Sequence, residues 1–112
     1  MSILVMKFGG TSVANLNRIK NLYKLIKKKI KNQEKKIVVV VSAMSGVTNN
    51  LIKEFKKVDL EISNPEYDVI LSTGEQFSAA YISAFLNKNG IKSRSILGWQ
   101  IPIQTDNKHS KA

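Results

Sequence analysis

The sequence IVVVVSAMSG, residues 37–46, joins an unbroken run of β-branched residues to a loop of small residues. Such a run is typical of a parallel strand that helices cover on both faces. Residues 3–8 form a second apolar run, which Gly9 and Gly10 end. The two runs predict strands at 3–8 and 37–41 in one mainly parallel sheet.

Helical patterns lie between and after these strands. Apolar residues recur at helical spacing over residues 13–31 and 47–57. A third pattern over 65–88, which counts Phe77 and Tyr81 as inward, follows a capping signal and a proline. Residues 91–97 predict a third strand, and residues 98–112 have the composition of a loop. This order predicts an α/β fold of three layers, αβα, with a mainly parallel sheet.

Length and composition narrow the classes of function. The chain has 112 residues and no cysteine, which excludes disulfides, thiolate metal sites and a cysteine nucleophile. His109 is the single histidine, so we expect no metal site and no histidine-based triad. No apolar run approaches the roughly 18 residues of a membrane span. We therefore expect a cytoplasmic protein with no membrane partner.

The formal net charge of +10 raises nucleic acid as a partner. Half of the basic residues lie between Arg18 and Lys36, and lysine far outnumbers arginine. A nucleic-acid-binding module would bind tightly and with a steep dependence on salt. Because the lysines fall on the polar side of a predicted helix, we favour a solvated helix face and no specific nucleic acid.

The segment KFGGTS, residues 7–12, leads from the first strand into the first helix. Glycines let a backbone approach a ligand closely, and free amides at a helix start favour an anion. Lys7 adds a positive charge suited to phosphate. A tight turn capped by Thr11 or Ser12 explains the same residues equally well.

Two further segments carry candidate chemistry. Residues 42–49 follow the second strand, so this loop also lies at the carboxyl ends of the strands, where ligands bind in open α/β sheets. By itself it fits a capped turn, but the pair of loops favours a phosphorylated ligand. The sequence STGEQ, residues 72–76, fits a capping box. In a continuous helix, Gly74 would instead allow close approach and Glu75 could bind an ammonium group.

Three colinear stretches cover the chain nearly end to end. VMKFGGTSVA (5–14), IVVVVSAMSGVTNNL (37–51) and the stretch from ILSTGEQF to IPIQTD (70–106) resemble the aspartate kinases of the amino acid kinase superfamily. The resemblance implies that residues 1–112 are the N-terminal portion of an amino acid kinase domain. The rest of that domain and the regulatory ACT domains of the family lie outside these residues.

The resemblance also implies an activity. The family uses ATP and Mg²⁺ to phosphorylate the β-carboxylate of L-aspartate to 4-phospho-L-aspartate, which leads to lysine, threonine and methionine. Catalysis and phosphate binding would fall to Lys7, Gly9, Gly10, Thr11 and Ser12. Aspartate would be bound by Ser42, Gly46, Thr48 and Glu75, the last holding its α-ammonium. The complete enzyme would be a homo-oligomer.

This chemistry needs no histidine or cysteine. Phosphoryl transfer depends mainly on positioning and charge neutralisation, and a carboxylate acceptor is already ionised at pH 7. We expect an incomplete kinase, and the alternative is a catalytically inactive truncated remnant with at most weak phosphate binding. A superfamily member acting on glutamate, acetylglutamate or a nucleotide agrees less well with residues 42–48 and 72–76.

Overall fold

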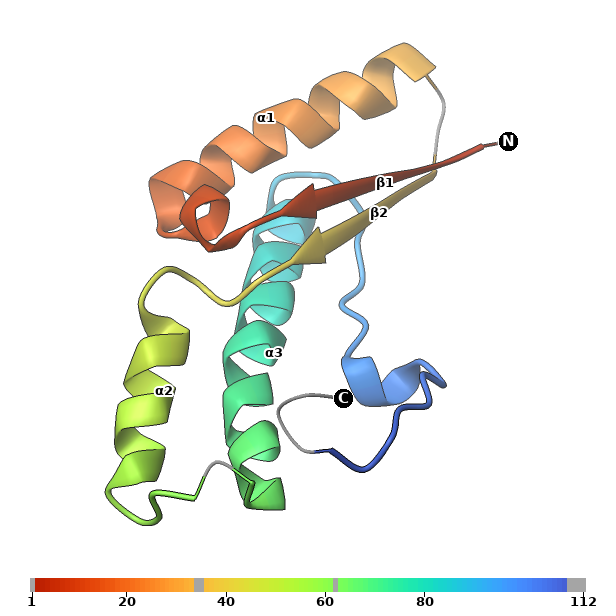
Figure 1. Ribbon diagram of the computed structural model, residues 1–112. Helices are drawn as coiled ribbons and strands as arrows, with labels where there is room; N and C mark the ends of the chain where they lie inside the picture. Colours follow the sequence, from red (N-terminus) through yellow and green to blue (C-terminus); the bar gives the residue numbers. More distant parts are fainter. Residues whose placement is uncertain (1, 34–35, 62, 109–112) are drawn as a thin grey trace.

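The computed structural model describes residues 2–33, 36–61 and 63–108 (Figure 1). His109 therefore lies outside the described residues. The elements in chain order are β1 (Ile3–Phe8), the 3₁₀ turn η1 (Gly10–Val13), α1 (Leu16–Gln33), β2 (Lys36–Val41), α2 (Val47–Lys56), α3 (Pro65–Lys88) and the 3₁₀ turn η2 (Gly98–Gln100). None of the helices found in these ranges has both the length and the apolar character needed to cross a membrane.

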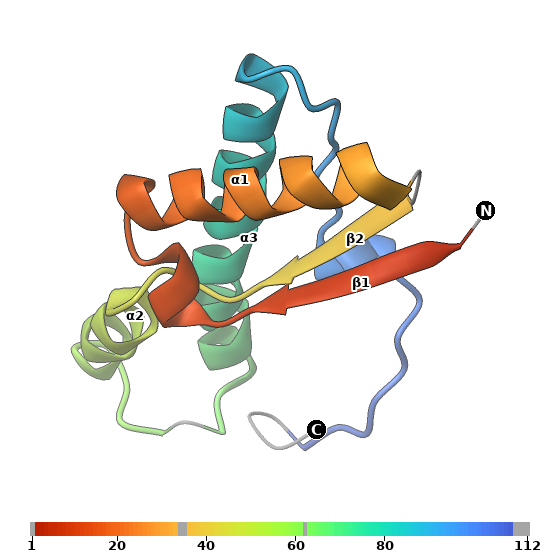
Figure 2. The same cartoon turned by 90° about the horizontal axis from the view of Figure 1, so that it is seen from above.

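β1 and β2 form a parallel pair. Ile3 lies opposite Lys36 and Phe8 opposite Val41, and α1 connects the two strands. The pairing brings the carboxyl ends of both strands to the same edge, as Figures 1 and 2 show. The predicted α/β class and parallel sheet are confirmed.

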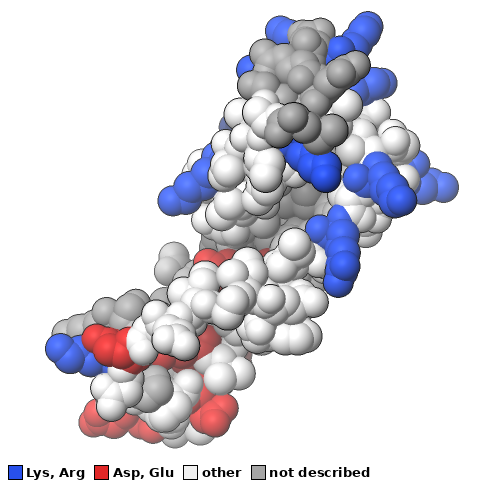
Figure 3. Space-filling view, turned by 90° about the vertical axis from the view of Figure 1, so that its right-hand side faces the viewer, with Lys and Arg blue, Asp and Glu red and all other residues white. Residues whose placement is uncertain are grey.

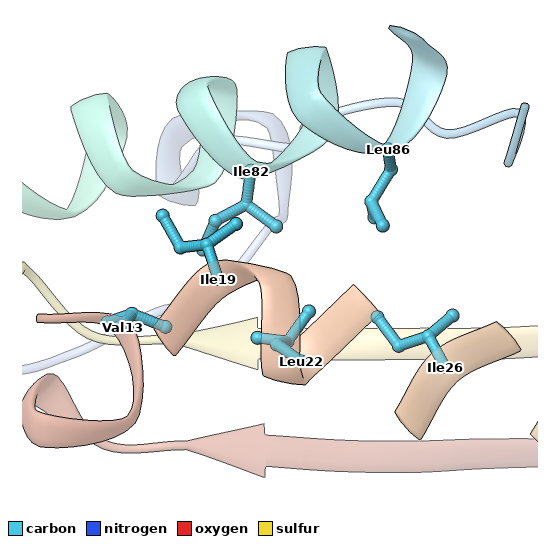
Figure 4. Close-up of a cluster of buried hydrophobic side chains, with 6 residues drawn as sticks. All are labelled: Val13, Ile19, Leu22, Ile26, Ile82 and Leu86. Carbon is cyan, nitrogen blue, oxygen red and sulfur yellow. The ribbon is translucent and has the colours of Figure 1, made fainter. Parts of the chain in front are cut away.

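The core lies between α1, α3 and one face of the sheet. Alternate strand residues, among them Met6, Phe8 and Val39, pack against it. Figure 4 shows side chains of α3 pointing toward those of α1. The buried cluster consists of Val13, Ile19, Leu22, Ile26, Ile82 and Leu86. Burying such side chains stabilises the fold by about 1.5–3 kcal/mol each.

The other face of the sheet is open. Ile3 and Val5 of β1 are 64% and 61% exposed, and Val38 and Val40 of β2 are 48% and 44% exposed. Within the described residues, helices cover one sheet face, so two of the three predicted layers are present. The β-branched run is apolar on both faces, which is the property that predicted cover on both.

The predicted start of the first helix, its predicted cap and two predicted inward residues of the third helix are wrong. The first helix begins at Leu16 rather than Val13, because the side chain of Asn15 caps it by accepting from the Arg18 amide at 3.0 Å. Neither Thr11 nor Ser12 is that cap. Phe77 and Tyr81 were expected to face inward, but they are 57% and 38% exposed and stack on each other with centroids 5.5 Å apart.

The predicted third strand is also wrong. Burial alternates residue by residue from Ile91 to Leu97, as in a strand, but the segment pairs with neither β1 nor β2. Side chains of α3 hold it instead. The Ser93 amide donates to the side chain of Asn87 at 2.7 Å, and the Ser93 hydroxyl lies 2.8 Å from that of Ser83.

Charge is unevenly distributed over the surface. The lysines of α1 are exposed, and on the face drawn in Figure 3 most Lys and Arg side chains gather at one end. Asp and Glu gather at the other end of that face. This agrees with a solvated basic helix, and the absence of a specific nucleic acid partner stays a prediction.

Asn64 anchors the start of α3. Its side chain accepts from the Glu66 amide at 3.0 Å and donates to the Asp59 carboxylate at 3.1 Å. The cap is therefore Asn64 rather than the predicted capping box, while Pro65 takes the first helical position as expected. The pKa of Asp59 lies below its ordinary value, chiefly because the Glu61 amide donates to it and next because Asn64 does.

We expect Asn64→Ala to lower the free energy of unfolding by about 1 kcal/mol, the usual cost of losing an N-cap. The lowered pKa of Asp59 contributes stability that is present above its unfolded pKa and lost as pH falls through the folded pKa. The difference in free energy of unfolding between Asn64→Ala and the parent should therefore become smaller in acid. Urea unfolding at neutral and acidic pH measures this difference. If the difference did not change with pH, Asn64 would not contribute to the lowered pKa of Asp59.

Candidate active site

The two predicted loops meet at the carboxyl ends of the strands. The Ser42 amide donates to the Phe8 carbonyl at 3.2 Å, which extends the strand pairing into the loops. A Cβ placed on Gly10 would lie 3.0 Å from the backbone oxygen of Ala43. The first loop, residues 9–13, and the second loop, residues 42–46, are therefore in direct contact, and any larger residue at position 10 would separate them.

The first loop is held by a buried residue at its end and is exposed to solvent along its outer side. The Ser12 amide donates to the Gly9 carbonyl at 3.0 Å, and Val13 is fully buried. Thr11 and Ser12 are exposed. A Cβ on Gly9 would meet no atom within 4 Å, so open space lies beside its backbone. This loop leaves room for a ligand to approach the chain closely.

Lys7 is exposed on the open face of the sheet. It pairs in register with Val40, one residue before β1 ends. Strand side chains alternate between faces, so Lys7 shares a face with Val5 while Phe8 points to the core. Its charge therefore stands beside the first loop on the side that the helices leave uncovered.

The second loop turns sharply into α2. Gly46 has a φ of +85°, a left-handed conformation that favours glycine, and it caps α2. The Asn50 amide donates to its carbonyl at 3.0 Å. Ser42 is half-buried and Ala43 is buried, whereas Ser45 and Thr48 are exposed. The loop is thus fixed at its start and exposed toward α2.

The STGEQ segment lies inside the continuous helix α3. The Ser72 hydroxyl donates to the Val69 carbonyl at 2.6 Å and accepts from the Gln76 side chain at 3.1 Å, so no capping box forms. Gly74 is buried, and a Cβ there would lie 3.1 Å from Ala43 Cβ. Glycine at this position lets α3 pass close to the second loop.

A cavity of about 360 Å³ brings two predicted substrate residues together. Thr48 of α2 and Glu75 of α3 both line it, with Tyr67, Asp68, Leu71 and Ser72. Neither Ser42, Gly46 nor the first loop lines this cavity. Sequence reasoning missed Asp68 and Ser72, although spacings of three, four and seven residues place them with Glu75 on one helix face.

The cavity combines groups suited to a small zwitterion. Its carboxylates can accept from an ammonium group, and the Thr48 hydroxyl can donate to a carboxylate. Across the part of the chain that the structure describes, no three His, Cys, Asp or Glu side chains gather as a metal site. We assign no metal ligand here.

Two bacterial aspartate kinases are similar in sequence over the whole of this chain. The aspartokinase of Rickettsia conorii is 47% identical over 116 residues, which cover 100% of this chain and 28% of that protein. The aspartate kinase of Pseudomonas fluorescens is 44% identical over 114 residues, covering 100% of this chain and 27% of that protein. The chain thus spans between a quarter and a third of these relatives' length.

The fold agrees with the sequence similarity. The crystal structure of aspartate kinase from Synechocystis matches with a TM-score of 0.74 at 37% identity, covering 80% of this chain and 15% of that one. The model of the Amino acid kinase family matches residues 2–112. This match includes both glycine-containing loops and the helix that carries Glu75. The chain therefore belongs to the amino acid kinase family.

Proposed function

We propose that the chain is the N-terminal part of the kinase domain of an aspartate kinase. That enzyme transfers the terminal phosphoryl group of ATP to the β-carboxylate of L-aspartate and forms 4-phospho-L-aspartate. The observation that carries the proposal is the cavity shared by Thr48 and Glu75, next to two contacting loops at the strand ends. The identity of 47% to the Rickettsia conorii aspartokinase supports the choice of substrate.

The first loop is the proposed phosphate site. The open space beside Gly9 admits phosphate oxygens to the backbone, and the exposed hydroxyls of Thr11 and Ser12 can donate to them. Gly10 keeps the loop against Ala43. Lys7 neutralises charge on the transferring group, which is the main demand of this reaction.

The metal accompanies the nucleotide in this proposal. Mg²⁺ in kinases is held largely by substrate phosphates, with one or two carboxylates and water. The exposed loop hydroxyls and the Lys7 charge suit phosphate oxygens, so the described residues fit the phosphate part of MgATP. When bound with the nucleotide, Mg²⁺ would neutralise part of the phosphate charge.

The second loop and α3 form the proposed aspartate site. Glu75 accepts from the α-ammonium group, and Thr48 donates to a carboxylate across the same cavity. Ser42 and Gly46 fix the loop before α2, and in this proposal they border the acceptor rather than line the cavity. No general base is required because the β-carboxylate is already ionised.

The wider setting of the proposal follows the similarity to aspartate kinases. The product would enter the biosynthesis of lysine, threonine and methionine in the cytoplasm. The complete enzyme would be a homo-oligomer. These statements rest on the resemblance of the three colinear sequence stretches. Growth complementation tests the pathway, cell fractionation tests the compartment, and the mass in solution tests the oligomeric state.

The deciding experiment places this chain in a complete kinase. In a chimera, residues 1–112 replace the aligned N-terminal segment of the Rickettsia conorii aspartokinase, and hydroxylamine traps the acyl phosphate. We expect product that depends on both aspartate and MgATP. A folded chimera without turnover would contradict the proposal. The purified chain is assayed in parallel, and turnover by the chain alone would exclude an inactive remnant.

Glu75→Gln tests the aspartate site within that chimera. Loss of a charge-assisted hydrogen bond, about 1.5–3 kcal/mol, should raise KM for aspartate about 10–100-fold. KM for MgATP should change less than about 2-fold, since Glu75 lies outside the first loop. Glu66→Gln is the control, because Glu66 is exposed on the same helix and does not line the cavity. Equal effects of the two variants would remove Glu75 from the site.

A further inference from the structure

Ser78 occupies a position in α3 that ordinarily takes an apolar residue. It follows Glu75 by three residues, and among the residues described it is the polar one whose side chain is fully buried, with 0% exposed. Polar side chains are buried at a cost unless they are hydrogen-bonded. The Ser78 hydroxyl donates to the Ser42 carbonyl at 2.8 Å, across 36 residues of sequence.

Two hydroxyls nearer the start of the same helix behave differently, whereas that of Ser83 also bonds outside the helix, to Ser93. Ser72 donates to Val69 and Thr73 donates to Ile70, each to a carbonyl of α3 itself. Such local bonds are the common choice of serine and threonine within helices. Ser78 instead fixes α3 to the start of the second loop.

Ser42 and its neighbour Ala43 also contact the end of β1 and the first loop. The Ser42 amide donates to the Phe8 carbonyl at 3.2 Å. Ala43 lies between two glycines, since its oxygen is 3.0 Å from a Cβ placed on Gly10 and its methyl is 3.1 Å from one placed on Gly74. Ser42 and Ala43 therefore fill the space between the first loop and α3.

The Ser42 carbonyl depends on this one side chain. In the described ranges no backbone amide is found donating to it, whereas its own amide is engaged with Phe8. Removing the Ser78 hydroxyl leaves this carbonyl without its donor beside a fully buried position, and we expect the local backbone to move in response. Because Ala43 touches Gly10 and Ser42 bonds to Phe8, directly before the first loop, that movement reaches Gly9 and Gly10.

We propose that Ser78 is a positioning residue that sets the first loop relative to the Glu75 face of α3. It acts through the Ser42 carbonyl and the Ala43 contacts, and it touches neither substrate. The assignment of the two sides to phosphate and aspartate rests on the proposed function. The mechanical link between α3 and the first loop does not depend on it.

The test compares amide NMR spectra of the full 112-residue chain, labelled with ¹⁵N, for the parent, Ser78→Ala and Thr73→Ala. Thr73→Ala also removes a hydroxyl from α3, but one that is exposed and bonds within the helix. We expect Ser78→Ala to shift the amide signals of Gly9 and Gly10 by more than their line widths, and Thr73→Ala to leave both in place. Shifts confined to α3 and residues 42–43 would overturn the proposal.

A second variant covers the case in which Ser78→Ala does not fold. Ser78→Cys fills the same site and exchanges a strong donor for a weak one. It should shift the same two glycine signals in the same direction by a smaller amount. Unmoved glycine signals in a folded Ser78→Cys chain would overturn the proposal. The spectra contain no substrate, so a failure of aspartate kinase activity and a failure of this link give separate results.

Discussion

Replacing Lys7 with alanine is expected to lower kcat/KM for phosphoryl transfer to L-aspartate by about 10²–10³-fold, the usual effect of removing one preorganised charge-stabilising group. Lys7 stands at the end of β1 beside the open space at Gly9. In the proposed reaction its ammonium group offsets charge on the transferring phosphoryl oxygens. The hydroxylamine assay on the chimera measures the loss directly.

Lys36 supplies a matched control for Lys7. Both lysines are exposed on strands of the same pair, but Lys36 lies at the opposite end, paired with Ile3. Lys36→Ala should leave kcat/KM within about 2-fold of the parent value. The free energy of unfolding of both variants should lie within about 0.5 kcal/mol of the parent value, as is usual for surface substitutions. Equal loss of activity in both variants would show a general effect of charge and remove Lys7 from catalysis.

Patterns that depend on local sequence predicted their elements well. The bounds of β1 and α3 agree with the prediction to within a residue, because the apolar pattern lies inside each segment and the terminal signals lie in it or directly beside it. Residues 91–97 have the alternation of a strand but no partner in the described structure. Pairing is a property of two segments, so the alternation alone could not establish a strand.

The buried face of α3 was harder to predict because it includes the small residues Gly74 and Ser78. The aromatic residues Phe77 and Tyr81 were predicted to face inward, but the buried residues include Gly74, Ser78, Ile82 and Leu86. These four recur every four residues, a regular helical spacing. Two of them are small because the second loop lies close by, and that proximity becomes visible only once the elements are packed together.

In the candidate site too, some features could be predicted from the sequence and others depend on how the elements pack. Each loop could be placed at the strand ends, since topology requires it. Whether Glu75 caps a helix or lines a cavity depended on whether α3 continues through STGEQ, and the sequence of that segment allowed both. The grouping of Thr48 with Glu75, and the omission of Ser42 from that cavity, depend on how α2 packs against α3.

Ile19→Ala should be the most destabilising single change that we consider. Ile19 is fully buried in the first turn of α1 and belongs to the cluster that joins α1 to Ile82 and Leu86 of α3. Truncation of a buried isoleucine to alanine costs about 2–5 kcal/mol, through lost burial and the cavity left behind. For a domain whose total stability is about 5–15 kcal/mol, that is a large share.

Urea unfolding followed by circular dichroism would measure this loss, with Leu25→Ala as the matched control. Leu25 is on the same helix but is 49% exposed, so its truncation should cost less than about half as much. Ile19→Val should cost about 0.5–1.5 kcal/mol, because it removes one methylene from the same site. If Ile19→Ala and Leu25→Ala lowered stability equally, the packing of α1 on α3 would not be what holds the sheet and its two loops in place.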